Sequence, residues 1–288
     1  MKTTAALKIG IVGLGRLGRR HALCLTQHVP AAQLVSACNP SRAALDWAGT
    51  MLGVEQLYQD FDRFIESADV DAVVLASPTT EHARQFELAM RAGKHVFVEK
   101  PLSLDLSTCE ALAQQAAACP NQVAMVGFER RFDPDIVRTR AAIERGELGR
   151  PFLVRSQTCD MHDPSGSFVR YSPNSGGIFQ DCTVHDIDLA RWMLGNPRAV
   201  KVFASGTNAI HAELARYQDV DNGLAIVEFE GGARAVFYAS RTMPHGHETT
   251  LEVIGTQGTV QVGFGAQLGA TTFRTAGGVR HPVLPDFY

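Results

Sequence analysis

Residues 7–18 read LKIGIVGLGRLG, an apolar run that stops at a glycine-rich turn. The turn has the pattern G-x-G-x-x-G, follows a predicted strand at residues 8–12 and opens a predicted helix at residues 15–28. In that setting the first glycine permits the tight turn, the second lets the backbone approach a pyrophosphate, and the third allows close helix–strand packing. The helix N-terminus adds free N–H groups for the phosphates. A glycine-rich turn without a ligand is the alternative.

Strands and helices continue to alternate up to about residue 128. They are separated by helical segments rather than hairpin turns, which is typical of βαβ units and a parallel sheet buried on both faces. We therefore predict an α/β protein whose residues 1–127 form a Rossmann dinucleotide-binding domain. The further strands are expected at residues 34–38, 71–77, 95–98 and 123–128, and the further helices at residues 81–91 and 107–118.

The pattern changes after residue 128. A Pro-, Ser- and Gly-rich loop at residues 160–177 divides the second half, and Gly231-Gly232 and Gln257-Gly258 indicate two-residue hairpin turns. We predict that residues 128–288 form a substrate-binding and oligomerisation domain of the α+β type with a largely antiparallel open sheet. Its helices are expected at residues 134–145 and about 182–194, and its strands at residues 152–157, 200–205, 223–230, 233–240, 249–254 and 259–262.

Composition excludes several classes of function. The formal net charge of −3 gives the chain no electrostatic reason to bind nucleic acid or an anionic membrane. No apolar run reaches transmembrane length, and the N-terminus lacks the apolar core of a signal peptide. The six cysteines form no C-x-x-C pair, which favours a reducing compartment and a cytoplasmic location. No metal is assigned, because no acid or cysteine stands at ligand spacing from His245-Gly246-His247.

The end of the second strand bears on the choice of cofactor. Asn39 stands where an acid usually binds the ribose 2′-hydroxyl. An amide can bond a hydroxyl without repelling a 2′-phosphate, which Ser41 and Arg42 could meet directly. Alternatively, Ser41 caps the next helix and Arg42 is solvated. The cofactor is therefore expected to be NAD or NADP.

Lys100 lies at the carboxyl end of a predicted buried strand, within Glu99-Lys100-Pro101. Open parallel sheets bind ligands outside those ends, and Pro101 ends the strand with a candidate cis peptide bond. A partly desolvated lysine there could donate to a substrate hydroxyl and lower the pKa of that hydroxyl. An ordinary surface lysine is the alternative.

Asp181 and His185 are four residues apart, a spacing that stacks two side chains on one face of a helix. A carboxylate beside an imidazole raises the basicity of the imidazole and fixes its orientation. Such a pair suits a general base that takes a hydroxyl proton while hydride leaves the same carbon. The alternative is an acid at a helix start and a packed histidine.

Three motifs now stand in order along the chain: residues 13–18, Glu99-Lys100-Pro101, and residues 176–188, which read GGIFQDCTVHDID. Together they resemble the glucose–fructose oxidoreductase / inositol dehydrogenase (Gfo/Idh/MocA) family, particularly its inositol 2-dehydrogenase-like branch. SPTTEH at residues 77–82 and GFERRFD at residues 127–133 support the resemblance, which covers nearly the whole chain.

The resemblance implies specific roles. His185 would be the general acid/base, Lys100 would polarise the reacting oxygen, and Asp181 would bind substrate or support the other two. The open sheet would form the interface of a homodimer or homotetramer. Besides Lys100, Asn39, Ser41 and Arg42, the residues expected to line the cofactor are Gly13, Gly15, Arg16, Leu17, Gly18, Ser77, Thr79, His82 and Glu99.

The substrate side departs from the family pattern. In CDMHDP at residues 159–164, His162 stands where inositol dehydrogenases tend to carry arginine, and RTMPHGH at residues 241–247 differs likewise. Asp160, His162 and His247 are therefore expected to contact substrate alongside Lys100, Asp181 and His185. The chain also ends at Tyr288, where relatives usually continue, so we expect either a C-terminal truncation or a reduced C-terminal core.

These features predict an NAD(P)-dependent dehydrogenase that moves a hydride between the nicotinamide and a CH–OH carbon of a cyclitol or sugar. The nicotinamide is expected to face Lys100 and His185 across the gap between the two halves. The alternatives are a keto- or anhydro-sugar reductase of the same fold and a non-catalytic NAD(P)-binding regulator, which would need none of Lys100, Asp181 and His185.

Overall fold

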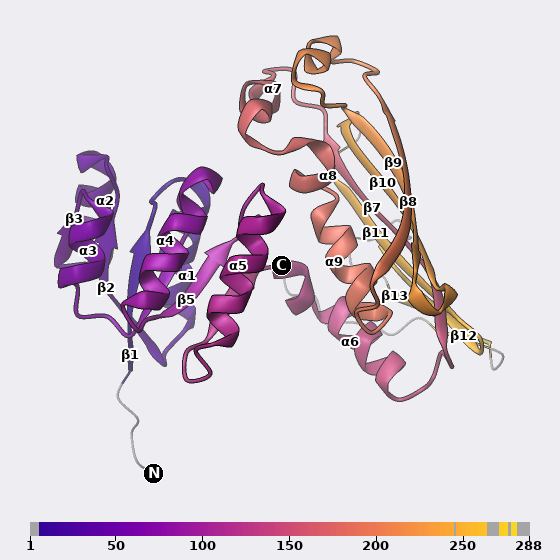
Figure 1. The fold of residues 1–288 in the computed structure, drawn as a ribbon, viewed down its shortest axis with the longest axis horizontal. Helices are drawn as coiled ribbons and strands as arrows, with labels where there is room; N and C mark the ends of the chain where they lie inside the picture. Colours follow the sequence, from indigo (N-terminus) through magenta and orange to yellow (C-terminus); the bar gives the residue numbers. More distant parts are fainter. Residues whose placement is uncertain (1–5, 245, 264–270, 276–277, 281–288) are drawn as a thin grey trace. The chain divides into compact units, whose positions relative to one another are not determined.

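The computed structural model describes residues 6–244, 246–263, 271–275 and 278–280, so His245 lies outside the described residues. The chain divides into two compact units, Met1–Gly127 and Phe128–Tyr288 (Figure 1). Among the described residues, no helix is long and apolar enough to cross a membrane.

The first unit contains a six-stranded sheet in the order β3-β2-β1-β4-β5-β6, and every strand pair in it is parallel. The strand order reverses between β1 and β4, as in the doubly wound Rossmann fold, so the predicted α/β class is confirmed. Its strands are β1 Leu7–Val12, β2 Ala32–Cys38, β3 Gln56–Tyr58, β4 Ala72–Leu75, β5 His95–Glu99 and β6 Ala124–Gly127. Its helices are α1 Arg16–His28, α2 Arg42–Leu52, α3 Phe61–Ser67, α4 Thr79–Arg91 and α5 Leu106–Ala117.

Strand β3 and helix α3 were not predicted, and α2 was considered only as the helix that Ser41 would cap. Strand β3 has three residues and α3 has seven, too few for a hydrophobic period to stand out. Helix α2 has signals at both of its ends, of which the sequence analysis used only the first. Ser41 is its N-cap, and Gly53 ends it in the left-handed region at a φ of 69°.

The second unit contains an eight-stranded sheet in the order β14-β13-β12-β11-β7-β10-β9-β8. Strands β10 and β7 pair in parallel and the other neighbours pair antiparallel, so the predicted open, largely antiparallel sheet is confirmed. Helices α8 and α9 lie along one face of the sheet, over the main core of this unit (Figure 1). Its strands are β7 Pro151–Met161, β8 Ala199–Thr207, β9 Asn222–Phe229, β10 Arg234–Met243, β11 Glu248–Gly255, β12 Gly258–Val262, β13 Thr271–Thr275 and β14 Gly278–Arg280. Its α-helices are α6 Pro134–Glu144, α7 Ser167–Tyr171, α8 Gly177–Asp181 and α9 Val184–Met193.

The predicted loop and helix around residues 160–194 need correction. Strand β7 continues to Met161, and α7 and a 3-10 turn at Ser172–Asn174 occupy part of the expected loop. The single helix expected at residues 182–194 is two helices, α8 and α9, with a break between them. At the break, the backbone N–H and the hydroxyl of Thr183 both donate to the carbonyl of Ile178, which ends the regular helical hydrogen-bond pattern.

The two hairpin predictions are correct in place and inexact in detail. Strands β9 and β10 are joined through a 3-10 turn at Glu230–Gly232, in which Gly231 and Gly232 have φ values of 79° and 82°. The connection, Glu230 to Ala233, therefore has four residues rather than two. Gly258 already belongs to β12, so Thr256 and Gln257 form the turn between β11 and β12.

Candidate functional site

The glycine-rich turn has the geometry that a pyrophosphate requires. Gly13 has a φ of 88°, and a Cβ on it would lie 2.5 Å from the carbonyl oxygen of Ala76. A Cβ on Gly18 would lie 1.9 Å from the Gly13 oxygen, so this glycine lets α1 pack against the turn. Nothing lies within 4 Å of a Cβ on Gly15, the N-cap of α1. The turn therefore leaves open space at a helix N-terminus, with Arg16 and Leu17 exposed beside it.

Asn39 connects this turn to the end of β2. Its Oδ1 accepts a hydrogen bond of 3.0 Å from the backbone N–H of Leu14. Ser41 Oγ caps α2 through the N–H of Ala44, and Arg42 forms an exposed pair with Asp46 on the same helix. The structure thus shows the helix-cap and solvated roles that the sequence left open for Ser41 and Arg42.

The Glu-Lys-Pro segment forms a tight turn at the carboxyl end of β5, and the Lys100–Pro101 peptide bond is cis, as the sequence suggested. Glu99 Oε1 lies 2.6 Å from His21 Nε2, and Glu99 Oε2 accepts from the backbone N–H of Lys100. His21 belongs to α1, the helix that the glycine-rich turn opens. Sequence reasoning missed this residue, because no local spacing connects two side chains 78 positions apart.

His82 lies behind that turn and is 1 % exposed. Its Nδ1 lies 2.8 Å from the carbonyl oxygen of Pro101, and its Nε2 lies 2.9 Å from the carbonyl oxygen of Ser77. Ser77 Oγ donates to Gln85 Oε1 within the same unit. His82 therefore ties the ends of β4 and β5 together, next to Thr79 at the start of α4.

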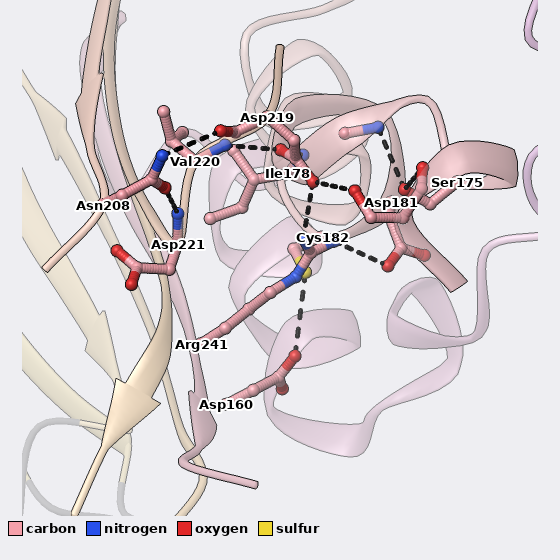
Figure 2. Close-up of polar contacts among 12 residues, drawn as sticks. Asp160, Ser175, Ile178, Asp181, Cys182, Asn208, Asp219, Val220, Asp221 and Arg241 are labelled. Carbon is pink, nitrogen blue, oxygen red and sulfur yellow. Dashed lines mark hydrogen bonds and ion pairs between the residues drawn. The ribbon is translucent and has the colours of Figure 1, made fainter. Parts of the chain in front are cut away.

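In the second unit, two of the predicted substrate residues, Asp160 and Asp181, belong to one polar cluster (Figure 2). The Cys182 thiol donates to Asp160 Oδ2, and His247 Nδ1 lies 3.2 Å from Asp160 Oδ1. Burial raises the pKa of Cys182 to about 12, so the thiol remains a neutral donor near neutral pH. Asp181, the neighbour of Cys182 along the chain, faces a different partner.

That partner is Arg241 on β10. Arg241 Nη2 lies 3.0 Å from Asp181 Oδ2, and Arg241 Nη1 lies 3.0 Å from Asp219 Oδ2 (Figure 2). The sequence contained a signal for Arg241 that we did not use. It continues the alternating inward positions of β10, after the buried residues Phe237 and Ala239. An arginine at a buried strand position needs an acidic partner.

His185 lies in α9 and is 8 % exposed. Its Nδ1 lies 3.5 Å from Glu129 Oε2, and the ring of Phe128 meets its ring edge-on at a centroid distance of 6.2 Å. Because α8 ends at Asp181 and α9 begins at Val184, the prediction that Asp181 and His185 share one helix face is wrong. The carboxylate found beside Nδ1 belongs to Glu129.

His162 belongs to a neighbouring group. Its Nδ1 lies 3.4 Å from His211 Nε2, and the ring of Phe168 packs edge-on against His211. Within the described part of the chain, no three His, Cys, Asp or Glu side chains gather closely enough to hold a metal ion.

Comparison with known families gives this geometry its context. A model described as "Oxidoreductase family, NAD-binding Rossmann fold" matches residues 7–128, and the "GFO/IDH/MocA C-terminal domain" model matches residues 136–261. The chain belongs to the GFO/IDH/MocA oxidoreductase family. This family member is therefore an NAD-dependent oxidoreductase, and the open space at Gly15 is where its residues fit the pyrophosphate of NAD.

Two relatives of this oxidoreductase carry names that state an activity. It is 36 % identical over 281 residues to the scyllo-inositol 2-dehydrogenase (NAD(+)) of Bacillus subtilis, covering 98 % of this chain and 80 % of the relative. It is 34 % identical over 254 residues to the myo-inositol 2-dehydrogenase of Thermotoga maritima, covering 88 % and 74 % of the two chains. Among solved structures, scyllo-inositol dehydrogenase from Lactobacillus casei with bound NAD(H) and scyllo-inositol matches with a TM-score of 0.86 and 37 % identity, over 98 % of this chain and 83 % of that chain.

Proposed function

We propose that this oxidoreductase is a cyclitol dehydrogenase that oxidises one CH–OH group of an inositol to a ketone. The observation that carries the proposal is the polar cluster of the second unit. In it, Asp160, Asp181 and His247 present hydrogen-bond acceptors and donors. The domain that holds this cluster and the NAD-binding Rossmann domain both match models of the same oxidoreductase family. A neutral polyol presents many hydroxyls, which such a mixed set of groups can bond. The inositol dehydrogenase names of the relatives support the same substrate class.

In this proposal each unit contributes its own groups to the oxidation of one CH–OH carbon. NAD+, when bound at the Gly13–Gly18 turn, supplies the acceptor for the hydride that leaves the CH–OH carbon. His185 takes the hydroxyl proton as the C–O bond becomes C=O, so the proton and the hydride account for both hydrogens lost. Lys100 donates to the same oxygen and favours its loss of the proton, and Asp181 accepts from a neighbouring hydroxyl.

The supporting geometry around these groups is of two kinds. Glu99 and His82 hold the backbone on either side of Lys100 within the first unit. In the second unit, Glu129 lies beside the Nδ1 of His185, which leaves Nε2 as the atom that we assign to the substrate proton.

The test is a substrate screen with scyllo-inositol, myo-inositol, aldoses and anhydro-sugars, with NAD+ and NADP+ side by side. We expect an inositol to reduce NAD+, with the His185→Ala variant inactive and still able to bind NAD+. Reduction of keto- or anhydro-sugars by NADH, without oxidation of any inositol, would favour the reductase. Tight NAD+ binding without turnover of any member of the panel would favour the non-catalytic regulator.

We further propose that the enzyme is a homo-oligomer that pairs through the face of the eight-stranded sheet opposite α8 and α9. On that face, Phe203, Leu224 and Ile226 are 67 %, 55 % and 50 % exposed, and Phe203 and Ile226 are cross-strand neighbours. An apolar patch of this kind favours contact with another protein surface. The six cysteines are all free thiols, which supports a cytoplasmic location. An Ile226→Glu variant should elute as a monomer where the wild type elutes as a dimer or tetramer; equal elution would contradict this interface.

A further inference from the structure

Arg241 occupies a buried position on the helix-covered face of β10. The strand alternates, with Ala235, Phe237 and Ala239 buried on the side of α8 and α9, and Arg241 continues that side at 3 % exposure. A buried guanidinium is costly unless carboxylates pair with it, because it loses most of its hydration. The carboxylates that pair with Arg241 therefore account for an arginine at this buried strand position.

Arg241 uses its two terminal nitrogens on two different carboxylates (Figure 2). Nη1 bonds Asp219, whose side chain is 3 % exposed, and Nη2 bonds Asp181, whose side chain is 24 % exposed. The ring of Phe168 covers the guanidinium, with its centroid 5.3 Å from the Arg241 Cζ. The Asp219 carboxylate is thus buried, whereas the Asp181 carboxylate is partly exposed and a ligand can reach it.

The two carboxylates lie at opposite ends of α8. Asp219 Oδ1 accepts from the backbone N–H of Ile178 in the first turn of the helix, and Asp219 Oδ2 accepts from Ser172 Oγ. Asp181 is the last residue of α8. One guanidinium therefore holds the beginning of α8 through Asp219 and its end through Asp181.

We propose that Arg241 is the positioning residue for Asp181 in cyclitol oxidation, an inference that rests on the proposed function. The guanidinium bonds Asp181 Oδ2 and fixes the direction of the carboxylate. A carboxylate has about four acceptor sites, of which the bond to Arg241 uses one, so Asp181 can bind Arg241 and a substrate hydroxyl together. Its charge-assisted bond to Asp181 holds the carboxylate as an acceptor for the O–H groups of a neutral polyol.

The test is a double-mutant cycle of Arg241→Met and Asp181→Asn, measured as kcat/KM for inositol with saturating NAD+. We expect Arg241→Met to lower kcat/KM by about 10- to 100-fold, mostly through the KM for inositol, with the KM for NAD+ unchanged. If Arg241 acts through Asp181, the double variant should be within about threefold of Asp181→Asn alone. Losses that multiply in the double variant, or an unchanged kcat/KM in folded Arg241→Met, would overturn the proposal.

Three further measurements keep the outcome interpretable. Arg241→Lys retains a cation but cannot place two nitrogens in a planar fork, so it should lose about tenfold; it replaces Arg241→Met in the cycle if that variant does not fold. Arg145→Met is the matched control, because Arg145 pairs with Glu147 just after α6, with 60 % of its side chain exposed; its kcat/KM should stay within about twofold of the wild type. Full activity of Asp181→Asn would contradict the role of Asp181 in the proposed function, whatever Arg241 does.

Discussion

Glu129 Oε2 lies 3.5 Å from Nδ1 of His185, so the imidazole assigned to proton transfer has a carboxylate on the side away from Nε2. Glu129 belongs to the 3-10 turn Glu129–Phe132, directly after the boundary between the two units. We propose that this carboxylate takes the orienting role that the sequence had suggested for Asp181.

Replacing Glu129 by Gln should lower kcat modestly. The Glu129 side chain is 65 % exposed, and an exposed ion pair contributes up to about 1 kcal/mol, which corresponds to a loss of at most about fivefold. Steady-state kinetics of NAD+ reduction at saturating inositol would measure it. A loss of a hundredfold or more would mean that Glu129 takes part in the chemistry itself, and an increase would contradict the orienting role.

Two glycines of the phosphate turn should respond differently to alanine. Gly18→Ala places a Cβ against the Gly13 carbonyl oxygen and should lower the free energy of unfolding by about 1–3 kcal/mol. Gly15→Ala meets no protein atom and should leave stability within about 1 kcal/mol, yet weaken NAD+ binding strongly because the methyl group occupies the pyrophosphate space. Thermal unfolding and NAD+ titration of both variants would separate the two effects. Unimpaired NAD+ binding by Gly15→Ala would show that the pyrophosphate lies elsewhere.

The bond from the Leu14 N–H to Asn39 Oδ1 should matter for cofactor affinity. Asn39→Leu removes the acceptor and leaves that N–H unpaired, so the Kd for NAD+ should rise about tenfold. Asn39→Asp keeps an acceptor and adds a negative charge, so NAD+ binding should change by less than about threefold while NADP+ binding weakens. Calorimetric titration of both cofactors would measure this. The exposed Arg42 serves as the control, because Arg42→Ala should leave the Kd for NAD+ unchanged.

Asp221 should make stability depend on pH. Burial acts to raise the pKa of Asp221, but hydrogen bonds from the backbone N–H groups of Ala209, Ile210 and His211 outweigh it and hold the pKa below its ordinary 3.8. A carboxyl with a lowered pKa in the folded state stabilises the fold above 3.8, and this contribution is lost as the pH falls through the folded-state pKa.

Asp221→Asn should therefore cost about 1–2 kcal/mol near neutral pH, and progressively less at acid pH. Urea unfolding across that range would show the convergence of the two proteins. The exposed variant Asp46→Asn should shift stability by less than about 0.5 kcal/mol at any pH. A constant difference between Asp221→Asn and the wild type would mean that the charge of Asp221 is not what stabilises the loop.

The Rossmann unit was predictable because its signals are local. The strand, the glycine-rich turn and the helix at residues 7–28 are contiguous. Gly13 and Gly18 have close backbone contacts of the kind that the pattern implied, and Gly15 has open space beside it. The contacts of the candidate site could not be predicted in the same way, and the roles of its residues remain predictions. His21 meets Glu99 and Glu129 meets His185 only after distant segments pack, and the break at Thr183 depends on a side-chain bond to Ile178 that the helical period does not reveal.

The most direct test of the central claim is NAD+ reduction by inositol in the wild type and in Lys100→Met, with the Kd for NAD+ measured on the same preparations. Removing a group that donates to the reacting oxygen should lower kcat by about 100- to 10,000-fold, while NAD+ binding at the glycine-rich turn stays within about threefold. An enzyme with Lys100→Met that reduces NAD+ at the wild-type rate would contradict the account.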